Sequence, residues 1–295
     1  MTGIKTLRIP SRSLVWLRGV VRITRLQNLV MIALTQYFTA YFLVDVHPTR
    51  RAYLIDTDLF LLVVSTVMIA AAGYIINDYY DVKIDFINKP RRVVVGTVLR
   101  RRMVIAAHTV LTIVGILIGF YLSWKVGIIH FSAAFLLWWY SNRLKRYPFI
   151  GNFSIAALSG LAIAVIGLYY RQHQFLVLTY ALFAFSISLL REIIKDMEDR
   201  RGDETFGCQT LPVIWGISKT KTLLYVLSGF FIFLLFFLSG TLGNRTLIIY
   251  FLLLIIPIAY FITKLVYADT KRDFAYLSDF CKLLMLSGIL SMAFF

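Results

Sequence analysis

Long apolar segments separated by short basic ones are the strongest constraint on how this chain of 295 residues can fold. A helix needs about 20 apolar residues to cross the hydrocarbon core of a bilayer, and lipid offers no partner to an unpaired backbone amide. The segments have helical length, so we predict an all-α, polytopic membrane protein that forms a single domain over residues 1–295. Nine spans are predicted, namely Leu26–Val44, Leu59–Asn77, Met103–Trp124, Val126–Tyr140, Asn152–Tyr170, Leu176–Ile194, Thr222–Ser239, Leu247–Val266 and Tyr276–Phe295.

The basic residues fall almost entirely in alternate loops. Of the 31 Lys and Arg residues, twenty-five lie at the N-terminus and in the even-numbered loops, five lie in the odd-numbered loops, and Lys282 lies inside the last span. Short cytoplasmic loops carry such an excess. We therefore predict a cell inner membrane protein with its N-terminus in the cytoplasm and its C-terminus outside it. The basic stretch Lys5–Arg25 does not resemble a cleavable signal peptide. The net charge of +16 is explained by contact with anionic membrane lipids and not by nucleic-acid binding.

Two of the predicted cytoplasmic loops hold most of the acidic residues. The first acidic cluster comprises Asn77, Asp78, Asp81 and Asp85, and the second comprises Glu192, Asp196, Asp199 and Asp203. In both clusters the aspartates are three and four residues apart, so on a helix they share one face. Nine of the fifteen Asp and Glu residues lie in these two stretches, which is more than solvated helix ends at a membrane surface would explain.

A row of carboxylates on one helix face is costly unless a cation neutralises it. Mg²⁺ is the natural candidate, because it prefers oxygen ligands and is usually held by one or two carboxylates together with substrate phosphates. Two clusters could hold Mg²⁺ ions on either side of a diphosphate and make it a better leaving group. Arg92 and Lys145 in the neighbouring basic loops are candidates to contact the diphosphate, although loop charge alone also explains them.

The order of these motifs resembles that of the UbiA superfamily of intramembrane prenyltransferases, and the likeness extends over the whole chain. The matching motifs are NDxxDxxxD at Asn77–Asp85, NxPxR at Asn88–Arg92, a tyrosine-to-lysine motif at Tyr140–Lys145, DxxxD at Asp199–Asp203, and an N-terminal element at Arg25 and Asn28. The resemblance implies a helical bundle around a central cavity. That cavity would take a prenyl diphosphate donor, a lipophilic acceptor and two Mg²⁺ ions.

The resemblance also implies roles for individual residues. One metal ion would be held by Asn77, Asp81 and Asp85, and the other by Asp199 and Asp203. Substrate would be bound by Arg25, Asn28, Arg92, Tyr140 and Lys145. The lysine comes five residues after the tyrosine, whereas many relatives have it after four, so Arg143 would share its role. Relatives also often read R-P-x-x-S-G where this chain has Arg92-Val93-Val94-Val95-Gly96.

The reaction implied by the resemblance is Mg²⁺-dependent transfer of a prenyl group, with geranylgeranyl as the expected chain. The stretch Arg191–Asp203 is most similar to members that prenylate geranylgeranylglyceryl phosphate and so form an ether lipid. An alcohol acceptor must lose a proton, and Glu192 or Asp196 could accept it. The alternative acceptor is an aromatic acid of quinone biosynthesis, such as 4-hydroxybenzoate or a naphthoate. A cation-coupled transporter is less favoured, because its carboxylates would lie near the middle of the membrane.

Overall fold

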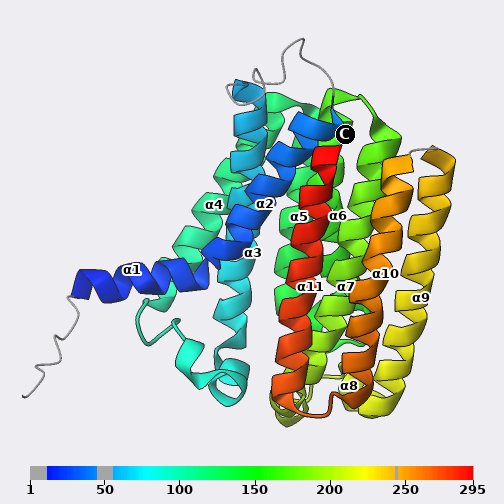
Figure 1. Cartoon of the computed structure of the whole chain (residues 1–295). Coiled ribbons are helices and arrows are strands. Elements are labelled where there is room, and N and C mark those ends of the chain that lie inside the picture. The colour runs from blue at the N-terminus through cyan, green and yellow to red at the C-terminus, as the bar shows by residue number, and fades with distance from the viewer. Residues whose placement is uncertain (1–11, 45–55, 243–244, 295) are drawn as a thin grey trace, which may run out of the picture.

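The structure is a computed structural model that describes residues 12–44, 56–242 and 245–294. These residues are almost entirely helical, and their only β feature is a bridge between Val95 and Leu99, which confirms the all-α prediction. Figure 1 shows a bundle of long helices from which the short helix α1 projects sideways. The helices are α1 (Arg12–Ile23), α2 (Leu26–Phe38), α3 (Thr57–Asn88), α4 (Arg101–Leu122), α5 (Trp124–Asn142), α6 (Ile150–Tyr170), α7 (Gln174–Thr205), α8 (Leu211–Ile214), α9 (Gly216–Leu242), α10 (Arg245–Tyr267) and α11 (Lys271–Ser291).

Seven helices in the described part of the chain are long and apolar enough to cross a membrane, namely α3, α4, α6, α7, α9, α10 and α11. They confirm seven of the nine predicted spans. The other two predictions fall on α2, which has 13 residues and continues into a π-helical turn at Thr39–Leu43, and on α5. Helix α5 ends in Trp138–Asn142, whose side chains suit the membrane interface better than its core. The start of the basic N-terminal stretch and Phe295 lie outside the described residues.

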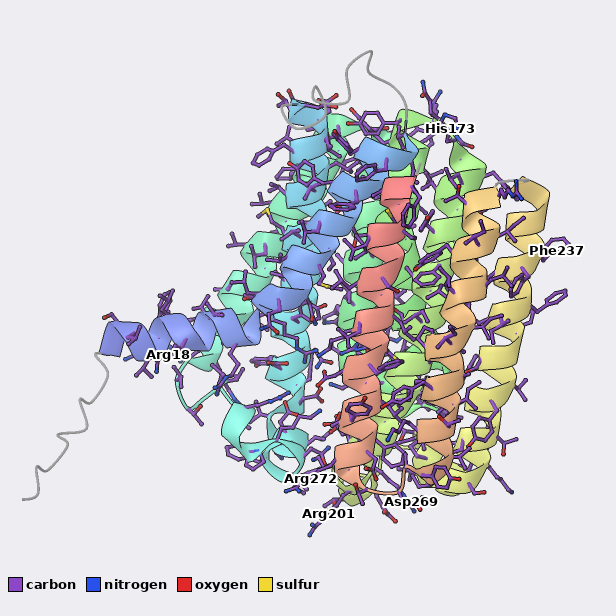
Figure 2. The ribbon with its side chains drawn as sticks, viewed as in Figure 1. Arg18, His173, Arg201, Phe237, Asp269 and Arg272 are labelled. Carbon is purple, nitrogen blue, oxygen red and sulfur yellow. The ribbon has the colours of Figure 1, made fainter. Side chains whose placement is uncertain are left out.

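The outer surface of the bundle is apolar along its length and charged at one end. Phe230, Phe233 and Phe237 on α9 are exposed, and Figure 2 shows Phe237 pointing away from the bundle. The same figure places Arg201, Asp269 and Arg272 together at the end where α7 finishes. An exposed aromatic surface on a long helix is expected where the neighbour is lipid.

Helices α3 and α7 are longer than a membrane requires. Each has 32 residues, and at a rise of 1.5 Å per residue each is about 48 Å long, against about 30 Å for the hydrocarbon core. Both finish at the lower end of the bundle in Figure 1. Their C-terminal turns therefore extend beyond the hydrocarbon core on the same side, and these turns carry the two acidic clusters.

Small residues let α7 pack closely against its neighbours α6 and α11. A Cβ at Gly160 of α6 would lie 2.9 Å from the Ala181 carbonyl oxygen, and one at Gly288 of α11 would lie 2.3 Å from the Phe183 ring. Close backbone approach of this kind is the main source of association between helices in lipid. It holds α7 in the middle of the bundle.

The segment between α3 and α4 turns back on α3 and is anchored by buried aliphatic side chains. Gly96 has φ +83°, a conformation that favours glycine, and its N–H donates to the Leu99 carbonyl at 2.8 Å. Val94 and Val95 are buried in a small core together with Val82 of α3. Val93, the residue after Arg92, is partly buried against the same core, so the segment is held against α3 by its valines.

Candidate active site

The first acidic cluster lies on the last turns of α3. Asn77 Nδ2 donates to Asp81 Oδ2 at 2.9 Å. The other Asp81 oxygen forms an ion pair with Lys145, which lies in the short turn between α5 and α6. Asp78 is paired instead with Arg25, at 3.0 Å. Asp81 is thus the aspartate held toward the lysine loop, while Asp78 ties α3 to the start of α2.

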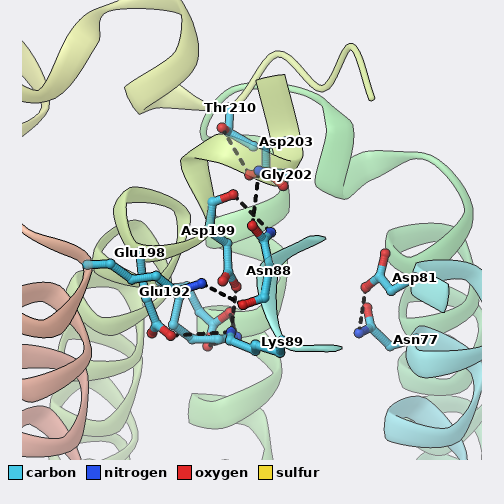
Figure 3. A network of polar contacts seen from close by, with 12 residues as sticks. Asn77, Asp81, Asn88, Lys89, Glu192, Glu198, Asp199, Gly202, Asp203 and Thr210 are labelled. Carbon is cyan, nitrogen blue, oxygen red and sulfur yellow. Dashed lines mark hydrogen bonds and ion pairs between the residues drawn. The ribbon is translucent and has the colours of Figure 1, made fainter. Parts of the chain in front are cut away.

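The second acidic cluster lies on the last turns of α7. Asp199 Oδ2 accepts from Lys89 Nζ at 2.7 Å, and Asp203 Oδ2 accepts from Thr210 Oγ1 at 3.3 Å. Lys89 follows α3 directly, so this ion pair joins the ends of the two long helices. Figure 3 shows Asn77 and Asp81 on one side of the site and Asp199 and Asp203 on the other.

Asn88 fastens the end of α3 to the end of α7. Its Nδ2 donates to the Asp199 carbonyl at 2.9 Å, and its Oδ1 accepts from the Gly202 N–H at 3.0 Å. Its own carbonyl accepts from Lys271 of α11 at 2.6 Å. A Cβ at Gly202 would lie 2.3 Å from Asn88 Nδ2, so glycine is the residue that admits this contact. We call these contacts of Asn88 the Asn88 clamp. The clamp fixes the distance between the two acidic clusters.

The two clusters form one negatively charged region. Asp85 lies within electrostatic reach of Asp199, and Asp203 within that of Asp81. The partial negative charge at the C-terminus of a helix adds to the repulsion. Burial disfavours the ammonium of Lys89, but the facing carboxylates, chiefly Asp199, outweigh burial and raise the pKa of Lys89 above its usual value. The region therefore holds cations strongly.

The donor set fits Mg²⁺. It consists of carboxylate and amide oxygens, which are the ligands this ion prefers. Asn77 Oδ1 and Asp199 Oδ1, one from each cluster, are buried and accept no hydrogen bond. Within the described residues, no three His, Cys, Asp or Glu side chains gather closely enough to hold a metal by themselves. This agrees with an ion that takes its remaining ligands from phosphate and water.

A cavity of about 390 Å³ extends into the bundle from this region. Its walls are mostly aliphatic and come from α2, α3, α5, α6, α7 and α11. Among the predicted site residues, those that line it are Arg25, Asn28, Asn77, Tyr140 and Glu192. A largely apolar cavity whose charged groups lie toward one end suits an amphiphilic ligand with a charged head and a hydrocarbon tail.

The two candidate proton acceptors differ in position. Glu192 is buried on the cavity wall, where Arg191 contacts one of its oxygens at 2.7 Å and Lys195 contacts the other at 2.9 Å. Asp196 is not on the cavity wall and accepts a hydrogen bond from Asn152 Nδ2 at 2.7 Å. Of the two, Glu192 is the one placed to meet a ligand.

Two predicted substrate-binding residues lie away from the clusters. Arg92 is exposed on the turn after α3. Arg143 is also exposed, and its Nε donates to the Tyr147 hydroxyl at 3.4 Å. Lys145 is the residue of the tyrosine-to-lysine motif that reaches the acidic region. Arg143 is thus turned outward while Lys145 points toward the acidic region.

Sequence reasoning missed the residues that hold the clusters together. Asn88 and Lys89 were visible as parts of a motif, but nothing in their spacing indicated contact with α7, 110 residues and more along the chain. Asn152 gave no signal at all. A glycine at position 202, inside an otherwise helical stretch, was the one available hint of a close contact.

These features define an integral membrane protein with a cavity inside its helical bundle and an acidic region beside that cavity. The sequence matches the UbiA prenyltransferase family over residues 29–286, and the chain belongs to that family. The match covers both acidic clusters and the lysine turn.

One curated relative is the digeranylgeranylglyceryl phosphate synthase of Thermococcus sibiricus. It is 39% identical over 156 residues, which make up 50% of this chain and 53% of the relative. The matched region thus spans about half the length of the first curated relatives.

Two solved structures share the fold. A structure of digeranylgeranylglyceryl phosphate synthase superposes with a TM-score of 0.66 and 23% identity, over 94% of this chain and 97% of the other. A UbiA homolog from Archaeoglobus fulgidus bound to GPP and Mg²⁺ gives a TM-score of 0.63 and 14% identity, over 93% and 99%. At these identities the likeness shows the fold alone.

Proposed function

We propose that this protein is a Mg²⁺-dependent prenyltransferase that moves a geranylgeranyl group from its diphosphate to geranylgeranylglyceryl phosphate, forming an ether lipid. The observation that carries the proposal is the apolar cavity that ends at two acidic clusters fastened together by Asn88. The name of the Thermococcus relative supports the acceptor, and the ligands of the Archaeoglobus homolog support the donor and the metal.

The acidic clusters would hold the diphosphate end of the donor. One Mg²⁺ would be held by Asn77, Asp81 and Asp85 and another by Asp199 and Asp203. When bound, the ions neutralise the diphosphate and make it a better leaving group. Lys145 and Lys89 pair with Asp81 and Asp199, which supports the proposal that both ammonium groups contact phosphate oxygens of the donor.

The chain's own residues would then govern the transfer. The bond between the allylic C1 and its diphosphate oxygen breaks, and the diphosphate keeps the electron pair. The apolar cavity excludes water from the allylic cation. The acceptor hydroxyl oxygen forms the new bond to C1, and its proton passes to Glu192 on the cavity wall. Once the acceptor oxygen has bonded to C1 it is positively charged and strongly acidic. Glu192, although its two cationic partners make it a weak base, can therefore accept the proton.

The proposal includes a membrane arrangement. Helices α2 and α5 complete nine spans in a single domain, with the acidic clusters and the N-terminus on the cytoplasmic side of the cell inner membrane. The excess of cationic residues in the even-numbered loops supports this orientation.

An acceptor panel read by mass spectrometry tests the function. The purified protein, with Mg²⁺ and geranylgeranyl diphosphate, receives either geranylgeranylglyceryl phosphate or 4-hydroxybenzoate. We expect the diether product from the first acceptor alone. A product from the aromatic acid alone would overturn the ether-lipid acceptor but keep the prenyltransferase, and no product from any acceptor would reject prenyl transfer.

A further inference from the structure

The cavity is lined by more cationic than anionic side chains. Arg25, Arg191, Lys195 and Lys282 line it, and Glu192 is the one carboxylate among its lining residues. The aspartates of the two metal clusters are not part of this lining. The cavity wall is therefore a separate, net positive region beside the negative one.

Two of these cations share a single counterion. Arg191 Nη1 lies 2.7 Å from Glu192 Oε1, and Lys195 Nζ lies 2.9 Å from Glu192 Oε2. The Arg191 Nε is buried and donates no hydrogen bond. Two cationic side chains thus face one carboxylate, and the buried Arg191 Nε has no acceptor. An additional anion would balance the charge and accept that hydrogen bond.

Lys282 adds a third cation from the opposite helix. It lies inside the last predicted span, where a charged side chain is costly and generally marks a functional site. Its partner is Asp279, at 2.7 Å, whose side chain is 73% exposed. That pair lies at the edge of the cavity, so an anion inside it can replace Asp279 without burying an unpaired charge.

Lys195 and Lys282 lie at one depth, and Arg191 lies one turn deeper on α7. Helix α7 runs toward the acidic end and α11 runs away from it (Figure 1). Lys195 is ten residues before the end of α7 and Lys282 is eleven residues after the start of α11, which puts each about 15 Å from that end. Cys281, next to Lys282, is within electrostatic reach of Arg191.

This depth matches what a phosphorylated alcohol acceptor requires. Lys195 and Arg191 lie one and two turns further into the bundle than Asp199. The reacting C1 of the donor lies on the cavity side of its diphosphate, so the acceptor hydroxyl must be there too. In a glycerol phosphate, the phosphate is only two carbons from that hydroxyl. Cations beyond the metal clusters are therefore needed to hold it.

We propose that Arg191, Lys195 and Lys282 form an anion site, separate from the metal clusters, that binds the phosphate monoester of the acceptor lipid. The inference rests on the proposed prenyl transfer for its meaning, but the site itself is tested independently of turnover. Lys282 is the residue to change, because its side chain is 43% exposed and its ion pair is with Asp279 on its own helix, so the packing of the bundle does not depend on it.

Steady-state kinetics give the first test. Lys282→Gln should raise KM for geranylgeranylglyceryl phosphate about tenfold, the effect of one lost charge-assisted hydrogen bond, and leave KM for the donor unchanged. Lys282→Arg should restore the acceptor KM, and the matched control Lys264→Gln, on the exposed side of α10, should not change it. With phosphate-free geranylgeranylglycerol, Lys282→Gln should equal the wild type. An equal loss with that alcohol, or a raised donor KM, would overturn the proposal.

Calorimetric binding in detergent without Mg²⁺ gives the second test. Geranylgeranylglyceryl phosphate should bind the wild type about tenfold more tightly than Lys282→Gln, while geranylgeranylglycerol should bind both alike. If Lys282→Gln also weakens the binding of phosphatidylglycerol about tenfold, the site binds lipid headgroups in general and the proposal is wrong. A wild type that binds as expected but forms no product with any acceptor would keep the anion site and reject the prenyl transfer.

Discussion

The contact between Gly202 and Asn88 allows one added methyl group to test whether the clamp aligns the two acidic clusters. In Gly202→Ala the new Cβ would lie 2.3 Å from Asn88 Nδ2, so the amide must move and both of its hydrogen bonds to α7 are lost. Those bonds contribute about 1 kcal/mol each, and buried groups left without partners cost about 1–3 kcal/mol more. Alanine returns about 1 kcal/mol of helix propensity. The expected net destabilisation is about 2–4 kcal/mol.

Activity should fall together with stability, because the clamp sets the distance between the metal clusters. If about 1.4 kcal/mol is needed to restore the arrangement in the transition state, turnover falls about tenfold. The control is Gly229→Ala on α9, where no atom lies within 4 Å of the added Cβ. That variant should be as active as the wild type and slightly more stable. Thermal unfolding in detergent and Mg²⁺-dependent diphosphate release measure the two quantities.

A double-mutant cycle separates the clamp from a general effect of the substitution. In an Asn88→Ala background the obstructing amide is gone, so Gly202→Ala should cost nothing further or should stabilise the helix. The coupling free energy between the two sites should then be at least as large as the cost of Gly202→Ala in the wild type, about 2–4 kcal/mol. If the two substitutions are additive, or if Gly202→Ala is as active as the wild type, the clamp does not align the clusters.

Three further predictions follow from the site and the membrane arrangement. Asp81→Ala and Asp199→Ala should each abolish turnover at saturating Mg²⁺ in protein that is still folded and inserted, with Glu204→Ala, an exposed acid on the same helix end, as the control; near-normal turnover in either would rule out two metal sites. Lys145→Ala should lower turnover at least tenfold, because its ammonium reaches the acidic region, whereas Arg143→Ala should change it less than threefold; the reverse order would move the diphosphate contact to Arg143. A tag at the C-terminus should be reached by a membrane-impermeant label in intact cells, and one between α3 and α4 should not; protection of the C-terminal tag would mean an even number of spans.

The sequence predicted the helical class and the two acidic clusters because both depend on local periodicity. Apolar segments of helical length identify long helices, and spacings of three and four residues put Asp78, Asp81 and Asp85 on one face of α3. It did not predict that Asp78 would pair with Arg25 and so differ from its two neighbours. That difference comes from the turn between α1 and α2, where Arg25 adopts φ 50°.

The local periodicity of the sequence could not predict contacts between segments that are far apart in the chain. The Asn88 clamp joins residues more than 110 positions apart, and no periodicity links an amide after one helix to a backbone N–H in another. The choice between Arg143 and Lys145 was equally inaccessible. Residues 144–146 form a single 3₁₀ turn after α5, and the direction of each side chain depends on where that turn begins.

The lengths of α3 and α7 explain how one cavity could serve ligands with incompatible ends. A diphosphate and its metal ions need water and fixed charges, whereas an isoprenoid chain and an allylic cation need a dry apolar wall. Helices of about 48 Å that cross a core of about 30 Å extend beyond it as rigid rods, so their carboxylates are held at the boundary by helical geometry and not by a flexible loop. The Asn88 contacts and the Lys89 ion pair join the two rods at their ends. Inserting one helical turn into α7 between Asp199 and the apolar segment would therefore separate charge from cavity while preserving every existing side chain, a change that should abolish transfer without unfolding the bundle.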